Sequence, residues 1–217
     1  SKKYISSNLD EKIEYRYNFL IKYQNENYAK KYKELIDYVR VIEKKLNIEK
    51  NDLTEAVANN YFKLMSYKDE YEVARLYSNK EFVNKIKNNF EGNFNINFHL
   101  SPPIFFKKDS HTGKPLKMKF GSWFFIVFRI LNFFKFIRGT FFDPFNYLHE
   151  RKIERKLIEE YQIKIRDIVS RLTTYNYKTA VEIASIPDQI RGFGYIKKKN
   201  IEIAKNCEDE LMSTFNE

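Results

Sequence analysis

The spacing of the apolar residues is the feature that most constrains the fold of this chain. From Leu9 to Leu46, and again from Leu53 to Leu76, apolar side chains recur mostly at steps of three and four. This period places them on one face of a helix, so both stretches predict amphipathic helices. We expect a break near residues 24–27, which gives two helices or one bent helix. The chain up to about residue 91 is therefore predicted to be helical.

One segment follows a different period. From Phe94 to Leu100 every second residue is apolar, which is typical of a strand with one buried face. Residues 104–108 and 116–120 flank a polar stretch that contains a glycine and suits a hairpin turn. We therefore expect a small antiparallel β element over about residues 93–120.

Helical periodicity returns in the rest of the chain. Apolar residues cover so much of the circumference of a helix over residues 123–137 that we expect it to be mostly buried. Asp143 and Pro144 predict the N-cap and first position of a long helix that continues to Leu172. Two further helices are expected, one over about residues 180–186 and one that runs toward Phe215.

These elements predict a mainly α fold, a helical bundle with a small antiparallel β element inserted between two helical halves. We expect a single domain, because 217 residues suit one domain. In it, residues 1–91 and 122–217 form the helical halves and residues 92–121 the strand and hairpin insert.

Composition excludes several kinds of site. The single cysteine, Cys207, cannot form an intramolecular disulfide or supply the ligands of an iron–sulfur cluster. No pair among His99, His111 and His149 has the spacing of a helical or finger-type metal site. The longest apolar run is shorter than the roughly 20 residues of a membrane span. We expect a cytoplasmic protein without a membrane span and without a metal or cofactor of its own.

The chain is basic, with 39 Lys and Arg against 29 Asp and Glu and a net charge of +10. Basic residues cluster around the expected hairpin, at Lys107, Lys108, Lys114, Lys117 and Lys119, and again over residues 197–199. Binding of single-stranded nucleic acid typically uses exposed aromatic residues among the charges, but the aromatic residues here mostly have the spacing of a helical core. The charge therefore favours an acidic protein partner over nucleic acid.

Three groups of polar residues form a candidate functional surface. The planar guanidinium of Arg191 suits a carboxylate or phosphate, and the neighbouring glycines allow close approach of a ligand. The architectural alternative is an ion pair between Arg191 and Glu70. In this alternative the glycines have positive φ in a tight turn between helices. Glu72 and Arg75 then form an ordinary ion pair within one helix. We assign no catalytic residue. The candidate surface comprises Glu70, Arg75, His99, Arg191, Gly192 and Gly194.

Six short segments of the chain resemble, in the same order, segments of a known family. They are residues 63–77, 98–103, 120–123, 138–145, 150–151 and 190–194. Together they resemble the C-terminal domain of the large fused indolepyruvate ferredoxin oxidoreductases, which is catalogued as a domain of unknown function. The sequence departs from the family at residues 195–197, where Tyr-Ile-Lys replaces a His-Val-Lys type ending, so no catalytic histidine is expected there.

The resemblance implies a parent enzyme that oxidatively decarboxylates arylpyruvates to acyl-CoA. Such an enzyme uses thiamine diphosphate, magnesium and iron–sulfur clusters, and passes electrons to ferredoxin. The chain has one cysteine and no Gly-Asp-Gly motif, so it lacks this machinery. We expect an accessory domain, a piece of the larger enzyme, that packs on the catalytic domains and is not catalytic alone.

Two alternatives come from other functional classes. One is a free-standing basic module that binds an acidic partner such as ferredoxin or nucleic acid. The other is a peripheral membrane protein that uses residues 123–142. An exposed apolar patch is the expected mark of an accessory domain, since it would be left uncovered by a missing partner.

Overall fold

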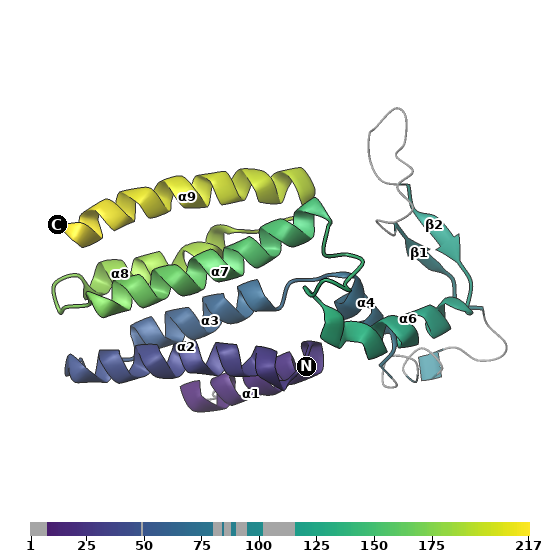
Figure 1. The fold of residues 1–217 in the computed structure, drawn as a ribbon, viewed down its shortest axis with the longest axis horizontal. Helices are drawn as coiled ribbons and strands as arrows, with labels where there is room; N and C mark the ends of the chain where they lie inside the picture. Colours follow the sequence, from purple (N-terminus) through teal and green to yellow (C-terminus); the bar gives the residue numbers. More distant parts are fainter. Residues whose placement is uncertain (1–7, 49, 80–83, 85–87, 90–94, 102–115) are drawn as a thin grey trace. The chain divides into compact units, whose positions relative to one another are not determined.

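The computed structural model describes residues 8–48, 50–79, 84, 88–89, 95–101 and 116–217 (Figure 1). Two compact units divide the chain: unit 1 comprises residues 1–67 and 147–217, and unit 2 comprises residues 68–146. Helices predominate, and the described strands form a two-stranded antiparallel sheet. The structure thus confirms the mainly α fold with a small antiparallel β element.

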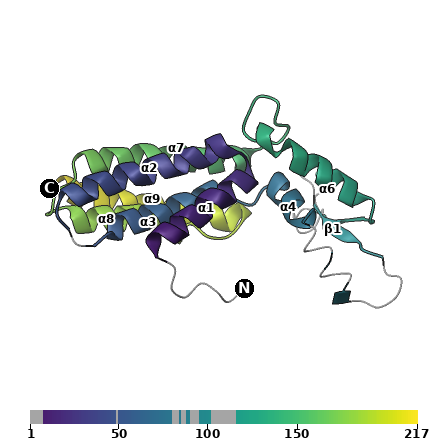
Figure 2. The ribbon, with the colours of Figure 1, turned by 90° about the horizontal axis from the view of Figure 1, so that it is seen from below.

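Unit 1 is a helical bundle in which several helices run along a common direction (Figure 1, Figure 2). The expected break near residues 24–27 is confirmed, because one helix ends at Tyr23 and the next begins at Glu26. The elements are α1 (Leu9–Tyr23), α2 (Glu26–Lys45), α3 (Asp52–Met65), α7 (His149–Ser170), α8 (Tyr177–Ser185), the 3₁₀ helix η3 (Ile186–Gln189) and α9 (Gly194–Asn216).

A row of stacked tyrosines crosses the core of unit 1. The ring centroids of Tyr32 and Tyr61 are 6.2 Å apart, and those of Tyr61 and Tyr161 are 5.9 Å apart. The hydroxyl of Tyr32 donates to the carbonyl of Ala58, and that of Tyr161 donates to the carbonyl of Ala184. Because these hydroxyls have acceptors, the rings can be buried without leaving a polar group unpaired.

The start of α3 is capped by a side chain from α2. The buried carboxylate of Glu43 accepts hydrogen bonds from the backbone N–H groups of Leu53 and Thr54, at 2.9 and 3.1 Å. It also accepts from the hydroxyl of Thr54 and, at 2.6 Å, from the hydroxyl of Tyr177 on α8. The N-cap residue Asn51 makes no side-chain cap bond, so Glu43 supplies the acceptors that this helix end needs.

Glu43→Gln is expected to lower the free energy of unfolding by about 1.5 to 3 kcal/mol, the size of hydrogen bonds to a charged group. An amide has one acceptor oxygen, and its NH₂ group would face the donors of α3. Urea denaturation followed by circular dichroism measures the change. Glu34→Gln on the exposed face of the same helix is the control, with an expected change below about 0.5 kcal/mol. Equal effects of the two substitutions would contradict the capping role.

Unit 2 contains α4 (Glu70–Tyr77), β1 (Phe98–Leu100), β2 (Met118–Phe120), α6 (Phe124–Phe133) and the 3₁₀ helix η2 (Phe134–Ile137). Strands β1 and β2 pair antiparallel with Phe98 opposite Phe120, so the alternating segment pairs with the second arm of the expected hairpin. The first arm of that hairpin, over residues 104–108, and its predicted turn, with His111 and the lysines at 107, 108 and 114, lie outside the described residues. Unit 2 is larger than the expected insert over residues 92–121, because α4 and α6 pack with the strands around Ala74, Phe98 and Phe128.

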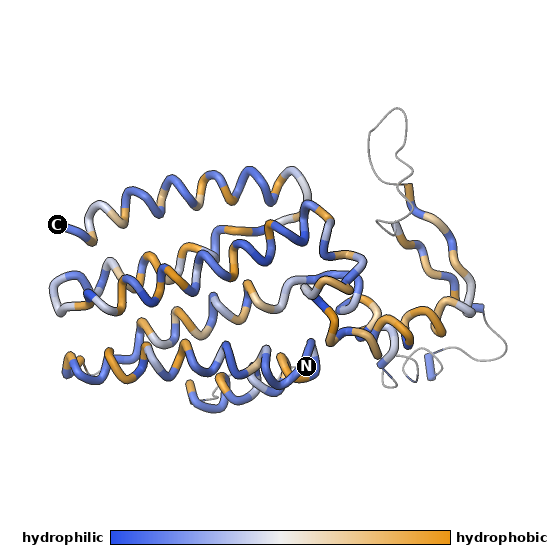
Figure 3. Tube along the Cα trace, in the orientation of Figure 1, coloured by the Kyte–Doolittle hydropathy of each residue, from blue (hydrophilic) through white to orange (hydrophobic). Residues whose placement is uncertain are grey.

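Two expectations for this part of the chain are wrong. The helix over residues 123–137 is not mostly buried. All residues of α6 are described, and Phe128 is the one residue of this helix that is buried. The elements of unit 2 cover one side of α6, although most of its residues are apolar (Figure 3). Asp143 is not the N-cap of the long helix, since α7 begins at His149 and the Asp143 carboxylate binds backbone N–H groups of its own loop.

Candidate functional site

The candidate residues in unit 2 lie on α4 and β1. Arg75 binds the carboxylate of Glu72 through two hydrogen bonds of 2.7 Å, which confirms this pair as a helical ion pair. Glu70 lies in the first turn of α4. His99 is exposed on β1, opposite Lys119 of β2. The guanidinium of Arg75 is therefore bound to its own helix.

The candidate residues in unit 1 form a tight turn before α9. Gly192 and Gly194 have φ values of +93° and +56°, which confirms the expected positive φ. The Nε of Arg191 donates to the carbonyl of Asp188 at 2.9 Å, and the carbonyl of Arg191 accepts from the side chain of Asn200 at 2.8 Å. These contacts favour the architectural alternative for the glycines. The ion pair between Arg191 and Glu70 would join different units and stays a prediction.

A buried ion pair that sequence reasoning missed lies in unit 2. The carboxylate of Asp69 accepts from Nε and Nη2 of Arg138 at 2.6 and 2.9 Å. Both side chains are almost fully buried, at 2% and 3% exposure. Asp69 also caps α4 by accepting from the N–H of Glu72 at 2.8 Å. The spacing of Asp69 and Glu72 resembles a capping box, but no sequence signal connects either residue to Arg138.

Asp143 completes this buried network. Its carboxylate accepts from the N–H groups of Gly139 and Phe145, at 2.7 and 2.9 Å, and from the hydroxyl of Tyr71 at 3.0 Å. Burial and the nearby Asp143 carboxylate raise the pKa of Tyr71. The guanidinium of Arg138 lies 5.3 Å from the centre of the Tyr71 ring. The protein itself supplies donors to both carboxylates, so the network fixes the loop after η2.

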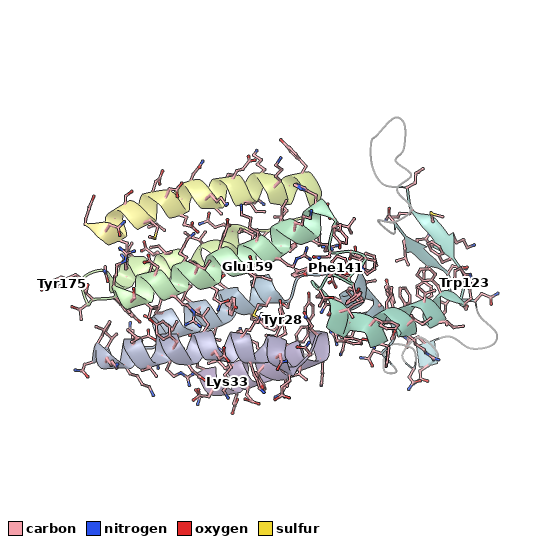
Figure 4. The ribbon with its side chains drawn as sticks, in the orientation of Figure 1. Tyr28, Lys33, Trp123, Phe141, Glu159 and Tyr175 are labelled. Carbon is pink, nitrogen blue, oxygen red and sulfur yellow. The ribbon has the colours of Figure 1, made fainter. Side chains whose placement is uncertain are left out.

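The exposed side of α6 and η2, together with Trp123 just before α6, carries large apolar side chains, which we call the apolar face. Figure 4 labels Trp123. The chain has no Asp or Glu from Leu116 to Phe142, and this stretch includes the cationic residues Lys117, Lys119 and Arg129. This stretch of the chain is therefore apolar and basic in sequence. The apolar face consists of Trp123, Ile126, Ile130, Phe133, Phe134 and Phe136, which are between 42% and 71% exposed.

A groove of about 490 Å³ lies in unit 1 between α7, η3 and α9. Its floor is apolar and includes Leu157 and Tyr161 of α7. Ion pairs between α7 and α9 cross it, joining Lys164 to Glu208, and Lys205 to Glu160 at 3.4 Å. Its lysines are therefore bound to the facing helix.

The groups implied for the parent enzyme do not fit this chain alone. Iron–sulfur clusters need several thiolates, and Cys207 is the one cysteine of the sequence. Among the residues that the structure describes, no three His, Cys, Asp or Glu side chains gather in a way that could hold a metal ion. No helix within the described ranges has both the length and the apolar character needed to cross a membrane.

A family model matches the chain over residues 9–210, and its description is a family of unknown function, DUF6537. No curated protein and no solved structure matches the chain significantly. The family match extends over residues of both units and includes the buried network and the apolar face of unit 2. The chain therefore belongs to the family of unknown function DUF6537.

Proposed function

We propose that this chain is an accessory domain of a cytoplasmic, thiamine diphosphate- and iron–sulfur-dependent indolepyruvate ferredoxin oxidoreductase, and that its apolar face packs on the catalytic domains. The resemblance of six ordered sequence segments supports the parent enzyme. The exposure of the apolar face is the observation that supports an assembly role. The cofactors belong to the catalytic domains, and the chain alone carries out no oxidation.

The two sides of α6 explain why a partner is needed. Phe124, Phe128 and Leu131 pack on the core of unit 2. Ile126, Ile130 and Phe133, at steps of four and three, form a second stripe on the exposed side. A helix with apolar stripes on both sides is typical of one buried between two bodies, since monomeric proteins rarely expose a contiguous apolar patch beyond a few hundred Å².

The charges in the stretch of chain that carries the apolar face favour a partner surface with acidic groups. Lys117, Lys119 and Arg129 lie in a stretch without acidic residues, and opposite charges across an interface increase the association rate and the specificity. Ferredoxin, an acidic electron carrier, is a further partner that this charge would suit. Salt dependence distinguishes this proposal from nucleic-acid binding, because the affinity for nucleic acid would fall steeply as the salt concentration rises.

Ile130→Asp is expected to weaken binding to the rest of the parent enzyme by at least about 30-fold, because an interface centre rarely tolerates an unpaired charge. Calorimetric titration of the chain into the remaining polypeptide, identified from the surrounding reading frame, measures the affinity. Ile203→Asp is a matched control, because Ile203 is 50% exposed on α9 and Ile130 is 52% exposed. The control is expected to bind within about twofold of wild type.

Failure of the wild-type chain to bind the rest of the enzyme would overturn the proposed function. Equal binding by Ile130→Asp would remove the apolar face from the interface. Cosedimentation of the wild-type chain with lipid vesicles, lost in Ile130→Asp, would instead support the peripheral membrane alternative.

A further inference from the structure

The loop of residues 138–146, which follows η2, presents two aromatic side chains to solvent. Phe141 and Phe142 are 79% and 78% exposed, and Figure 4 labels the first of them. Their rings meet edge to face with centroids 5.6 Å apart. Exposed apolar side chains that are scattered singly need no explanation, but two large rings in contact with each other do.

Hydrogen bonds within the loop fix its backbone. The carboxylate of Asp143 accepts from the N–H groups of Gly139 and Phe145, which lie on either side of the two exposed rings. The hydroxyl and the N–H of Thr140 both donate to the carbonyl of Ile137, at 2.7 and 2.9 Å. Gly139 has a φ of +75°, a conformation that favours glycine. The loop thus has a defined shape before any partner binds.

Both ends of the loop are held by buried side chains. At the start, Arg138 makes its paired hydrogen bonds with Asp69. Near the end, the buried ring of Phe145 packs edge to face on Tyr71 with centroids 5.4 Å apart. Unit 2 therefore uses its buried polar network to hold an exposed pair of rings in one place.

We infer that Phe141 and Phe142 are a preformed anchor that inserts into an apolar pocket of the catalytic domains of the parent enzyme. This inference rests on the proposed function and names two residues that act as binding hot spots beside the apolar face. Aromatic side chains that fill a pocket are typical binding hot spots. A loop that is already ordered loses less conformational entropy on binding, so more of the contact energy contributes to affinity.

The charges of the loop favour a protein pocket over a lipid surface. Interfacial binding to anionic lipid relies on Lys and Arg beside the aromatic residues. Residues 139–146 contain no Lys or Arg, and the guanidinium of Arg138 is buried against Asp69. A fixed ring geometry gives no advantage in a fluid bilayer, whereas it can be complementary in shape to a protein pocket.

The test is a calorimetric titration of the full chain into the rest of the parent enzyme. The double variant Phe141→Ala, Phe142→Ala is expected to raise Kd by at least about 30-fold. Tyr175→Ala, on a side chain that is 98% exposed in unit 1, is the control and is expected to bind as wild type. Thermal unfolding of the double variant is measured beside wild type, so that a loss of binding by the folded chain is distinguished from unfolding.

Each outcome decides the inference. If the wild-type chain binds and the double variant binds equally well, the anchor is overturned while the proposed function stands. If the wild-type chain does not bind, the proposed function and the anchor fail together. If the chain cosediments with phosphatidylcholine–phosphatidylserine vesicles and the double variant does not, the rings contact lipid and the protein pocket is overturned.

Discussion

Arg138→Ala is expected to lower the free energy of unfolding of unit 2 by about 3 to 5 kcal/mol, the cost of removing one partner of a buried ion pair. The carboxylate of Asp69 would stay buried without its two charge-assisted hydrogen bonds. The fluorescence of Trp123, the one tryptophan of the chain and a residue of unit 2, reports this transition in the full-length protein.

Arg129→Ala is the control for this prediction. Arg129 is an exposed arginine of α6 in the same unit, so its replacement is expected to change the unfolding free energy by less than about 0.5 kcal/mol. If Arg138→Ala and Arg129→Ala unfold at the same denaturant concentration, the buried pair does not stabilise unit 2.

Unit 1 is expected to lose its stability between pH 10 and 12 because of its tyrosine row. Burial raises the pKa of Tyr32 and Tyr61 to about 12 from the ordinary value of 10, and raises that of Tyr161 well above it. Below pH 10 the hydroxyls are protonated in both states, so the full stability is present. Above pH 10 the unfolded chain releases protons first, and stability falls as the pH approaches the folded pKa.

The expected loss is large compared with the stability of a domain. A shift of two pKa units corresponds to about 2.7 kcal/mol per tyrosine, so Tyr32 and Tyr61 together account for about 5 kcal/mol. Typical domains are stable by roughly 5 to 15 kcal/mol. A pH titration should therefore show loss of helical circular dichroism together with a rise in tyrosinate absorbance.

Tyr61→Phe should make this alkaline transition less steep, because one ionising group is removed from the unfolded state. Its hydroxyl makes a long hydrogen bond of 3.3 Å to Gln162, so little native structure is lost with it. Complete ionisation of the buried tyrosines near pH 10 with the helices intact would contradict the prediction.

The helices of unit 1 could be predicted from sequence because their apolar period reports directly on a shared core. The same pattern predicted the burial of α6 wrongly. It shows which residues are apolar, but it does not show whether the rest of the fold covers them. Ile130 and Phe133 have core spacing and are nevertheless exposed. The pattern located an apolar helix correctly and predicted the wrong surroundings for it.

The buried network of unit 2 could not be found from periodicity. Asp69 and Arg138 are 69 positions apart, and a polar pair at that distance leaves no local pattern. Asp143 does carry a local signal, because an Asp before a Pro often caps a helix. Here that same carboxylate binds N–H groups of a loop, and only the tertiary structure distinguishes the two uses.

The discontinuous order of unit 1 has a consequence for its synthesis on the ribosome. Tyr61 on α3 and Gln162 on α7, which meet in the folded core, are 101 positions apart in the chain, with all of unit 2 between them. At roughly 5 to 20 residues per second, the nascent α1–α3 segment waits about 5 to 20 s for α7 to be made. During that interval its apolar faces are uncovered, and exposed apolar surface of this kind makes a nascent chain prone to aggregation.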